Sequence, residues 1–200
     1  MGRVSQAQAQ ENRRRVVDTA SRLFREQGTH VSVADLMKAA GLTHGAFYKQ
    51  FASKEALVDE ATVHALDEQA RRRAAGLEKY GGRLDAAQRD LIERYLSAEH
   101  RDNAADGCPV AALAADVARE PEDREVRRVY AEGVAGFAAF LAAAGGRAGD
   151  SGEVGEGGGE GGIARLCTLV GALVLSRATQ GSPLSEEILA AAHAALTEAD

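Results

Sequence analysis

The stretch from Ser32 to Phe51 reads SVADLMKAAGLTHGAFYKQF and predicts two short helices joined by a tight turn. Apolar residues at positions 33, 36, 37 and 40 follow helical spacing, so one stripe of the first helix is expected to be buried. Ser32 suits the N-cap of that helix. Gly41 suits the left-handed turn after it, because glycine has no Cβ to strain. The pattern indicates a helix-turn-helix.

The second helix of the pair is expected to run from His44 to about Phe51. Phe47 should face inward, whereas His44 and Tyr48 should be neighbours on the outer face, since residues four apart meet on a helix surface. Gly45 lowers helix stability and therefore needs a reason. Close approach of the backbone to a large ligand is one such reason.

The composition predicts an all-α protein of about nine helices, because hydrophobic residues make up 45% of the chain, alanine is abundant and there are only 3 prolines. We expect an N-terminal helix-turn-helix domain of three helices over residues 1–54. A C-terminal helical domain for ligand binding and dimerisation should follow over residues 55–200. Within it, the glycine-rich residues 145–162 are expected to form a flexible linker.

Charge is divided unevenly along the chain, whose net charge is −6. Residues 1–54 carry 9 Lys and Arg against 4 Asp and Glu, a net of +5, whereas residues 55–200 carry a net of −11. This division suggests a basic head that faces DNA on an acidic body. Arg13, Arg14 and Arg15 lie in the first turn of the helix expected before the helix-turn-helix pair, where the helix dipole favours acidic residues. They are expected to face an external anion, with a solvated basic face as the alternative.

The location is expected to be cytoplasmic, with no membrane partner. The N-terminus lacks a signal-peptide pattern, and the longest apolar run, Leu166–Leu175, is about half the length needed to span a bilayer. Two cysteines in separate helices do not suggest a disulfide framework. No metal and no cofactor are expected.

Cys108 stands at the expected N-cap of a helix whose first residue is Pro109. A thiol there lies at the positive end of the helix, which raises its reactivity. Cys108 could therefore sense oxidants or electrophiles, or it could be a small residue that lines a pocket or the core. Paired with His100 it is the one candidate for nucleophilic catalysis, and no third member is evident. The chain is therefore not expected to be an enzyme.

The last two expected helices carry more apolar surface than one small domain can cover. A homodimer through about residues 163–197 would cover it. Helices in the middle of the chain are expected to form a pocket for a small hydrophobic effector, although the same side chains would serve equally well as core. The candidate lining residues are Tyr95, Cys108, Leu113, Tyr130, Phe137 and Phe140.

Residues 11–60 resemble the N-terminal domain of the tetracycline-repressor (TetR) family of transcriptional regulators. The resemblance rests on the amphipathic first helix that ends at Gly28, on VADLMKAAGLTHGAFYKQF, and on SKEAL directly after it. It covers about a quarter of the chain and implies a homodimeric repressor that binds a palindromic operator in double-stranded DNA and is released by a small-molecule effector. Gln50 departs from the histidine that is frequent in the family at this position, which puts operator preference or local packing in doubt.

On this interpretation the helix from His44 to about Phe51 would enter the major groove of DNA with its first turn leading. His44 is the first candidate for reading bases, whereas Tyr48 and Lys49 are suited to phosphates. The expected DNA-contacting residues are Thr29, Ser32, Thr43, His44, Gly45, Tyr48, Lys49 and Lys54. Two alternatives stay open: a regulator that senses oxidants through Cys108, and a helical scaffold that binds no DNA.

Overall fold

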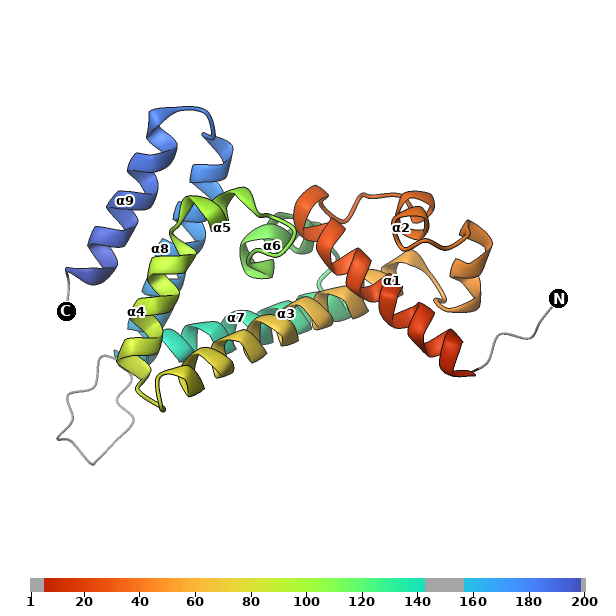
Figure 1. Cartoon of the computed structure of the whole chain (residues 1–200), viewed down its shortest axis with the longest axis horizontal. Helices are drawn as coiled ribbons and strands as arrows, with labels where there is room; N and C mark the ends of the chain where they lie inside the picture. Colours follow the sequence, from red (N-terminus) through yellow and green to blue (C-terminus); the bar gives the residue numbers. More distant parts are fainter. Residues whose placement is uncertain (1–5, 143–156, 199–200) are drawn as a thin grey trace. The chain divides into compact units, whose positions relative to one another are not determined.

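The computed structural model describes residues 6–142 and 157–198, and the regular structure of these residues is entirely helical (Figure 1). Nine α-helices and one 3₁₀ helix, η1, are present in this part of the chain, which confirms the all-α prediction. In chain order the elements are α1 (Gln6–Gln27), α2 (Val33–Ala39), η1 (His44–Lys49), α3 (Lys54–Lys79), α4 (Leu84–Tyr95), α5 (Ala98–Asp102), α6 (Pro109–Arg119), α7 (Glu125–Ala142), α8 (Gly157–Ala178) and α9 (Pro183–Thr197).

The chain forms two compact units, and two of the three boundaries between them fall inside long helices. Unit 1 comprises residues 1–67 and 104–130, and unit 2 comprises residues 68–103 and 131–200. Helices α3 and α7 each contribute to both units. The functional boundary expected at residue 54 stays a prediction, because the units divide the chain by packing alone.

Unit 1 is organised around one hydrophobic core to which α1, α2, η1, α3 and α6 all contribute. Helix α1 packs on α2 and α6, and α2 packs on η1. Phe24, Met37 and Phe47 are almost fully buried there, as the apolar spacing predicted. The chain reverses between α2 and η1 at Gly41, whose φ of 69° is strained for residues with a side chain. The Leu42 N–H then donates to the Met37 carbonyl at 2.8 Å and closes the end of α2.

Unit 2 contains α4, α5, α8 and α9, with α8 packed along α9 and both packed on α4. Polar side chains tie these helices together. The Arg177 guanidinium donates to the carbonyl oxygens of His100 and Arg101 at 3.0 and 2.9 Å, next to the end of α5. The hydroxyl of the buried Ser185 donates to the Ser176 carbonyl at 2.7 Å. Ser182 is the N-cap of α9.

The predicted linker over residues 145–162 is partly wrong, because α8 begins at Gly157. Residues 145–156 lie outside the described residues. Gly162 shows why glycine can occur in this helix: a Cβ placed on it would collide with the Ala138 carbonyl and with Ala142 of α7. Glycine therefore permits α8 to lie close to α7. By length and composition alone the segment Gly159–Ala178 could cross a membrane, a test that core helices of globular proteins also pass.

Two neighbouring glycines of α8 give a matched test of this packing. Gly162→Ala should destabilise the protein by about 1–3 kcal/mol, because the added methyl group has no room. Gly161→Ala should stabilise it by about 0.5–1 kcal/mol, because a Cβ at that position meets nothing within 4 Å and alanine favours the helix. Urea unfolding followed by circular dichroism measures both changes. Equal effects of the two substitutions would contradict close packing at Gly162.

Candidate nucleic-acid interface

The predicted recognition helix is η1, and it is a 3₁₀ helix and not the α-helix expected from the sequence. The Ala46 N–H donates to the Thr43 carbonyl at 3.0 Å, and the Gln50 N–H donates to the Phe47 carbonyl at 2.8 Å. Hydrogen bonds in 3₁₀ helices have poorer geometry, and runs longer than three or four residues are uncommon. The six residues of η1 therefore depend on neighbouring elements to keep their conformation.

Two buried phenylalanines fix the orientation of η1. Phe47 is 0% exposed and Phe51 is 3% exposed, and their rings stack with centroids 5.4 Å apart. Burying these rings turns the opposite side of η1 to solvent. Tyr48 is 66% exposed although it is aromatic, and the edge of its ring meets the Phe47 ring at 5.1 Å. An exposed aromatic side chain on a rigid base is suited to contacting a partner.

The outer face of η1 carries the predicted DNA-contacting side chains. Thr43, His44, Gly45, Tyr48 and Lys49 are all exposed. The rings of His44 and Tyr48 meet edge to face at 6.0 Å, as expected of neighbours. A Cβ on Gly45 would meet nothing within 4 Å, so packing inside the protein does not explain the glycine. Thr43 occupies the N-cap position, but its side chain makes no capping hydrogen bond.

The other three predicted contact residues flank η1 in the chain. Ser32 is exposed and caps α2: its hydroxyl accepts from the Asp35 N–H at 3.1 Å and donates to the Asp35 carboxylate at 2.6 Å. The Thr29 N–H is already used, because it donates to Asp116 of α6 at 2.8 Å. Lys54 is the first residue of α3 and is half-buried. All eight predicted residues belong to unit 1.

Arg13 has a role that the sequence pattern missed. Its guanidinium donates to the Gln50 carbonyl and pairs with both carboxylate oxygens of Glu60, and it lies 4.3 Å from the centroid of the Phe51 ring. The prediction that Arg13 faces an external anion was therefore wrong. Arg14 is exposed and pairs with Glu11 at 3.3 Å within α1.

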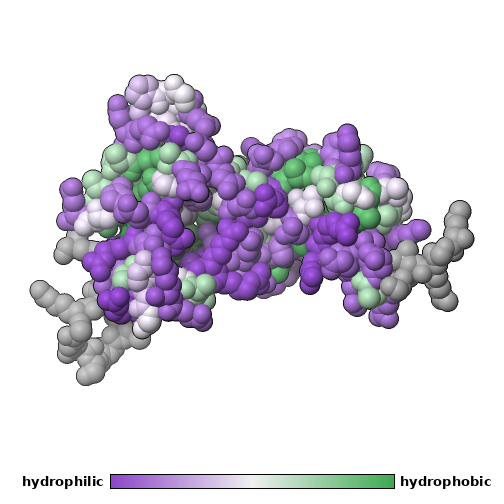
Figure 2. All heavy atoms as spheres, viewed as in Figure 1, coloured by the Kyte–Doolittle hydropathy of each residue, from purple (hydrophilic) through white to green (hydrophobic). Residues whose placement is uncertain are grey.

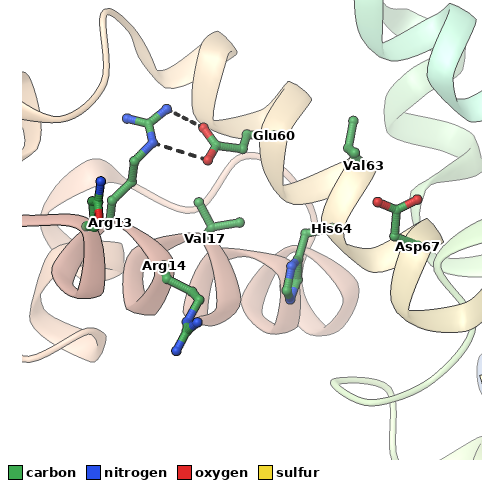
Figure 3. Close-up of a pocket in the computed structure, with 8 residues that line it drawn as sticks. Arg13, Arg14, Val17, Glu60, Val63, His64 and Asp67 are labelled. Atoms are coloured by element: carbon green, nitrogen blue, oxygen red, sulfur yellow. Dashed lines mark hydrogen bonds and ion pairs between the residues drawn. The ribbon is translucent and has the colours of Figure 1, made fainter. Parts of the chain in front are cut away.

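A shallow groove of about 330 Å³ lies between α1 and α3 beside Arg13 (Figure 3). Its basic arginines come from α1 and its acidic side chains come from α3, and the Arg13–Glu60 pair forms part of its wall. His64 in the groove also lies 3.5 Å from the Asp18 carboxylate. The lining residues are Gln10, Arg13, Arg14, Val17, Glu60, Val63, His64 and Asp67.

Three of the six predicted effector-binding residues lie in unit 1. Leu113 is part of the core of that unit, and Tyr130 packs against the core. The Tyr130 hydroxyl donates to the Val110 carbonyl at 2.6 Å, and burial raises the pKa of Tyr130 to about 12. Cys108 is the N-cap of α6, as predicted, but it is only 3% exposed. Its sulfur is therefore not directly open to a dissolved oxidant.

The other three, Tyr95, Phe137 and Phe140, lie in unit 2. The Tyr95 ring meets Phe137 at 6.2 Å and His100 at 4.6 Å. Burial lowers the pKa of His100, so its imidazole is neutral at neutral pH. Its Nδ1 lies 2.7 Å from the Tyr95 carbonyl and must carry the proton, because a carbonyl only accepts. A pocket shared by all six residues stays a prediction.

Residues 16–61 match the family described as bacterial regulatory proteins, tetR family. The HTH-type transcriptional regulator AcrR of Shigella flexneri is 43% identical over 61 residues, a match that spans 30% of this chain and 28% of that regulator.

Solved structures share the fold across almost the whole chain. The reduced form of E. coli NemR is 21% identical with a TM-score of 0.77, and the match covers 94% of this chain and 96% of that one. A TetR-family transcriptional regulator from Agrobacterium tumefaciens is 22% identical with a TM-score of 0.72, and the match covers 96% of each chain.

The two N-caps of the helix-turn-helix differ in a way that stability measurements can detect. Ser32→Ala should cost about 1 kcal/mol, because the Asp35 N–H loses its side-chain acceptor. Thr43→Ala should change stability by less than about 0.5 kcal/mol, because no capping hydrogen bond is lost. Thermal unfolding of the two variants provides the comparison. A larger loss for Thr43→Ala would show that the assignment of the caps is wrong.

Proposed function

Since the chain belongs to the tetR family of bacterial regulatory proteins, we propose that it regulates transcription by placing η1 in the major groove of an operator. The observation that carries the proposal is the outer face of η1. His44, Tyr48 and Lys49 stand exposed on an element whose inner face is locked into the core by Phe47. This arrangement presents donors to DNA in a fixed orientation. Family membership also supports a role other than catalysis.

The individual contacts follow from the chemistry of each side chain. His44, with Thr43 beside it, begins η1 and is the candidate for reading base edges. Tyr48 and Lys49 supply a hydroxyl and a cation for phosphates, and Lys54 adds a cation at the start of α3. Gly45 leaves room for the backbone to approach the groove. Thr29 and Ser32 complete the proposed contacts from the segment before α2.

The apolar surface of α8 and α9 supports a homodimer through about residues 163–197. Ile163, Val174, Leu175 and Leu184 are each 43% to 56% exposed, and all four lie on these two helices. Apolar surface is visible over the α8 and α9 region in Figure 2. A two-fold axis through this surface would pair two copies of η1 roughly 34–36 Å apart, one turn of a palindromic operator.

The regulator is proposed to act as a cytoplasmic repressor that a small hydrophobic effector releases from DNA. Aromatic side chains of unit 2, with Tyr95 and Phe137 beside a neutral His100, suit an apolar molecule with a weak polar group. Phe140 is a further proposed contact in the same unit. Release follows if the effector binds better to the form that does not bind DNA.

A thiol sensor that acts through Cys108 is the second candidate. The position of Cys108 at the N-cap of α6 supports it, because a thiol at the positive end of a helix is more reactive. The burial of Cys108 means that unit 1 must open locally before an oxidant reaches the sulfur. The scaffold alternative is the weakest of the three, because it gives no reason for an exposed Tyr48 beside Lys49.

The recognition assignment is tested by the double substitution Tyr48→Ala with Lys49→Ala. It should weaken binding to the operator by at least about a hundredfold, because each lost contact to DNA contributes about 1–3 kcal/mol to the binding free energy. Lys79→Ala with Tyr80→Ala is the matched control, since it removes the same residue types from the end of α3 in unit 2. An electrophoretic mobility shift measures both. Unchanged operator affinity in the first variant would refute the assignment.

The dimer is tested by Leu175→Glu, which puts a charge on the apolar face of α8. The variant should sediment as a monomer at concentrations where the parent is a dimer, because a carboxylate cannot be buried there unpaired. Val63→Glu is the control, because Val63 is also an exposed apolar residue but lies on α3. Sedimentation velocity distinguishes the two. If Leu175→Glu remains dimeric, the interface lies elsewhere.

A further inference from the structure

The Arg13 guanidinium joins three elements of unit 1 at one point. Arg13 itself lies on α1, Gln50 is the C-cap of η1, and Glu60 lies on α3. Its Nη1 donates to the Gln50 carbonyl, while Nε lies 3.2 Å from one oxygen of Glu60 and Nη2 pairs with the other. Figure 3 shows the two parallel contacts between the Arg13 and Glu60 side chains. A fork of this kind fixes direction as well as distance.

The contact acts at the end of η1 where the helix most needs support. Gln50 closes η1, so its carbonyl oxygen has no partner within that helix. A cation at the C-terminal end of a helix also complements the partial negative charge there. Arg13 therefore supplies both a donor and a charge to an element of six residues that contains Gly45.

The same guanidinium bears on the ring that anchors η1. It lies 4.3 Å from the centroid of Phe51, which stacks on Phe47 at 5.4 Å. Phe47 in turn meets the exposed Tyr48 at 5.1 Å. A continuous series of contacts thus leads from Arg13 to the outer face of η1.

From this series of contacts we infer that Arg13 is a positioning residue for DNA recognition, which holds η1 in its binding orientation without itself touching DNA. The inference rests on the proposed function. Pre-organised contact surfaces bind more tightly because less ordering is left to occur on binding. Glu60 contributes to the same positioning, because its carboxylate on α3 holds the Arg13 guanidinium in place.

Arg13→Lys is the informative variant, because lysine keeps the charge but cannot reach Gln50 and both oxygens of Glu60 with one planar fork. Arg22→Lys is the matched control: Arg22 also lies on α1 and is also ion-paired, but its partner is Asp106, which precedes α6 and is not part of η1. The probes are a duplex that the parent protein enriches from a random-sequence pool, and a poly(dA-dT) duplex as nonspecific DNA.

Arg13→Lys should weaken binding to the enriched duplex about tenfold and leave binding to poly(dA-dT) unchanged. The slope of the logarithm of affinity against the logarithm of salt concentration should equal that of the parent. Arg22→Lys should change none of the three. If the slope of Arg13→Lys falls by about one, Arg13 contacts a phosphate and the inference is overturned. The inference would also be overturned if Arg13→Lys bound the enriched duplex as tightly as the parent does. Glu60→Gln should shift affinity in the same direction by a smaller factor, and it tests the same positioning should Arg13→Lys fail to fold.

Amide hydrogen exchange measures, without DNA, how firmly Arg13 holds the end of η1. The Gln50 and Phe51 N–H groups both donate to the Phe47 carbonyl, at 2.8 and 3.0 Å. In Arg13→Lys these two amides should exchange about tenfold faster than in the parent, while core amides of α1 keep their rates. If the parent enriches no duplex, the regulatory function fails and exchange alone decides the role of Arg13. Unchanged exchange at both amides would overturn that role.

Discussion

Burial of the Phe47 and Phe51 rings is the constraint on which the DNA-facing surface depends. Each ring contributes roughly 1.5–3 kcal/mol by leaving water, which is more than the net value of one hydrogen bond in a short helix. The two residues lie four positions apart, and both rings are buried in the core of unit 1. The core, and not helical propensity, therefore determines how η1 is oriented. This is why the structure tolerates Gly45 in so short an element.

Local chemistry made part of the fold predictable. The Ser32 cap, the left-handed Gly41 and the Cys108–Pro109 helix start depend on residues within a few positions of each other, and all three occur as expected. The failures are non-local. The partners of Arg13 lie 37 and 47 positions away, so its inward orientation could not be inferred from the neighbouring residues of α1. Gly162 faces α7, and its glycine-rich neighbourhood alone suggested a linker.

The two halves of the candidate site were not equally predictable. The outer face of η1 follows from its inner face, because fixing Phe47 inside leaves His44 and Tyr48 outside. An effector pocket has no such rule, since aromatic and aliphatic side chains suit a core as well as a ligand. Leu113 shows the ambiguity: its apolar character suggested a pocket wall, and the structure places it in the core of unit 1.

The positive net charge of residues 1–54 is cancelled by other residues of unit 1 once the chain is folded. Residues 1–54 carry a net charge of +5, but unit 1, which adds residues 55–67 and 104–130, carries a net charge of −1. The added segments bring Glu60 and Asp106, which neutralise Arg13 and Arg22 inside the unit. Attraction to phosphates therefore cannot come from the charge of the unit as a whole. It has to come from where a few exposed cations stand, with Lys49 on the outer face of η1 foremost among them, so the orientation of that short helix matters more than the number of basic residues.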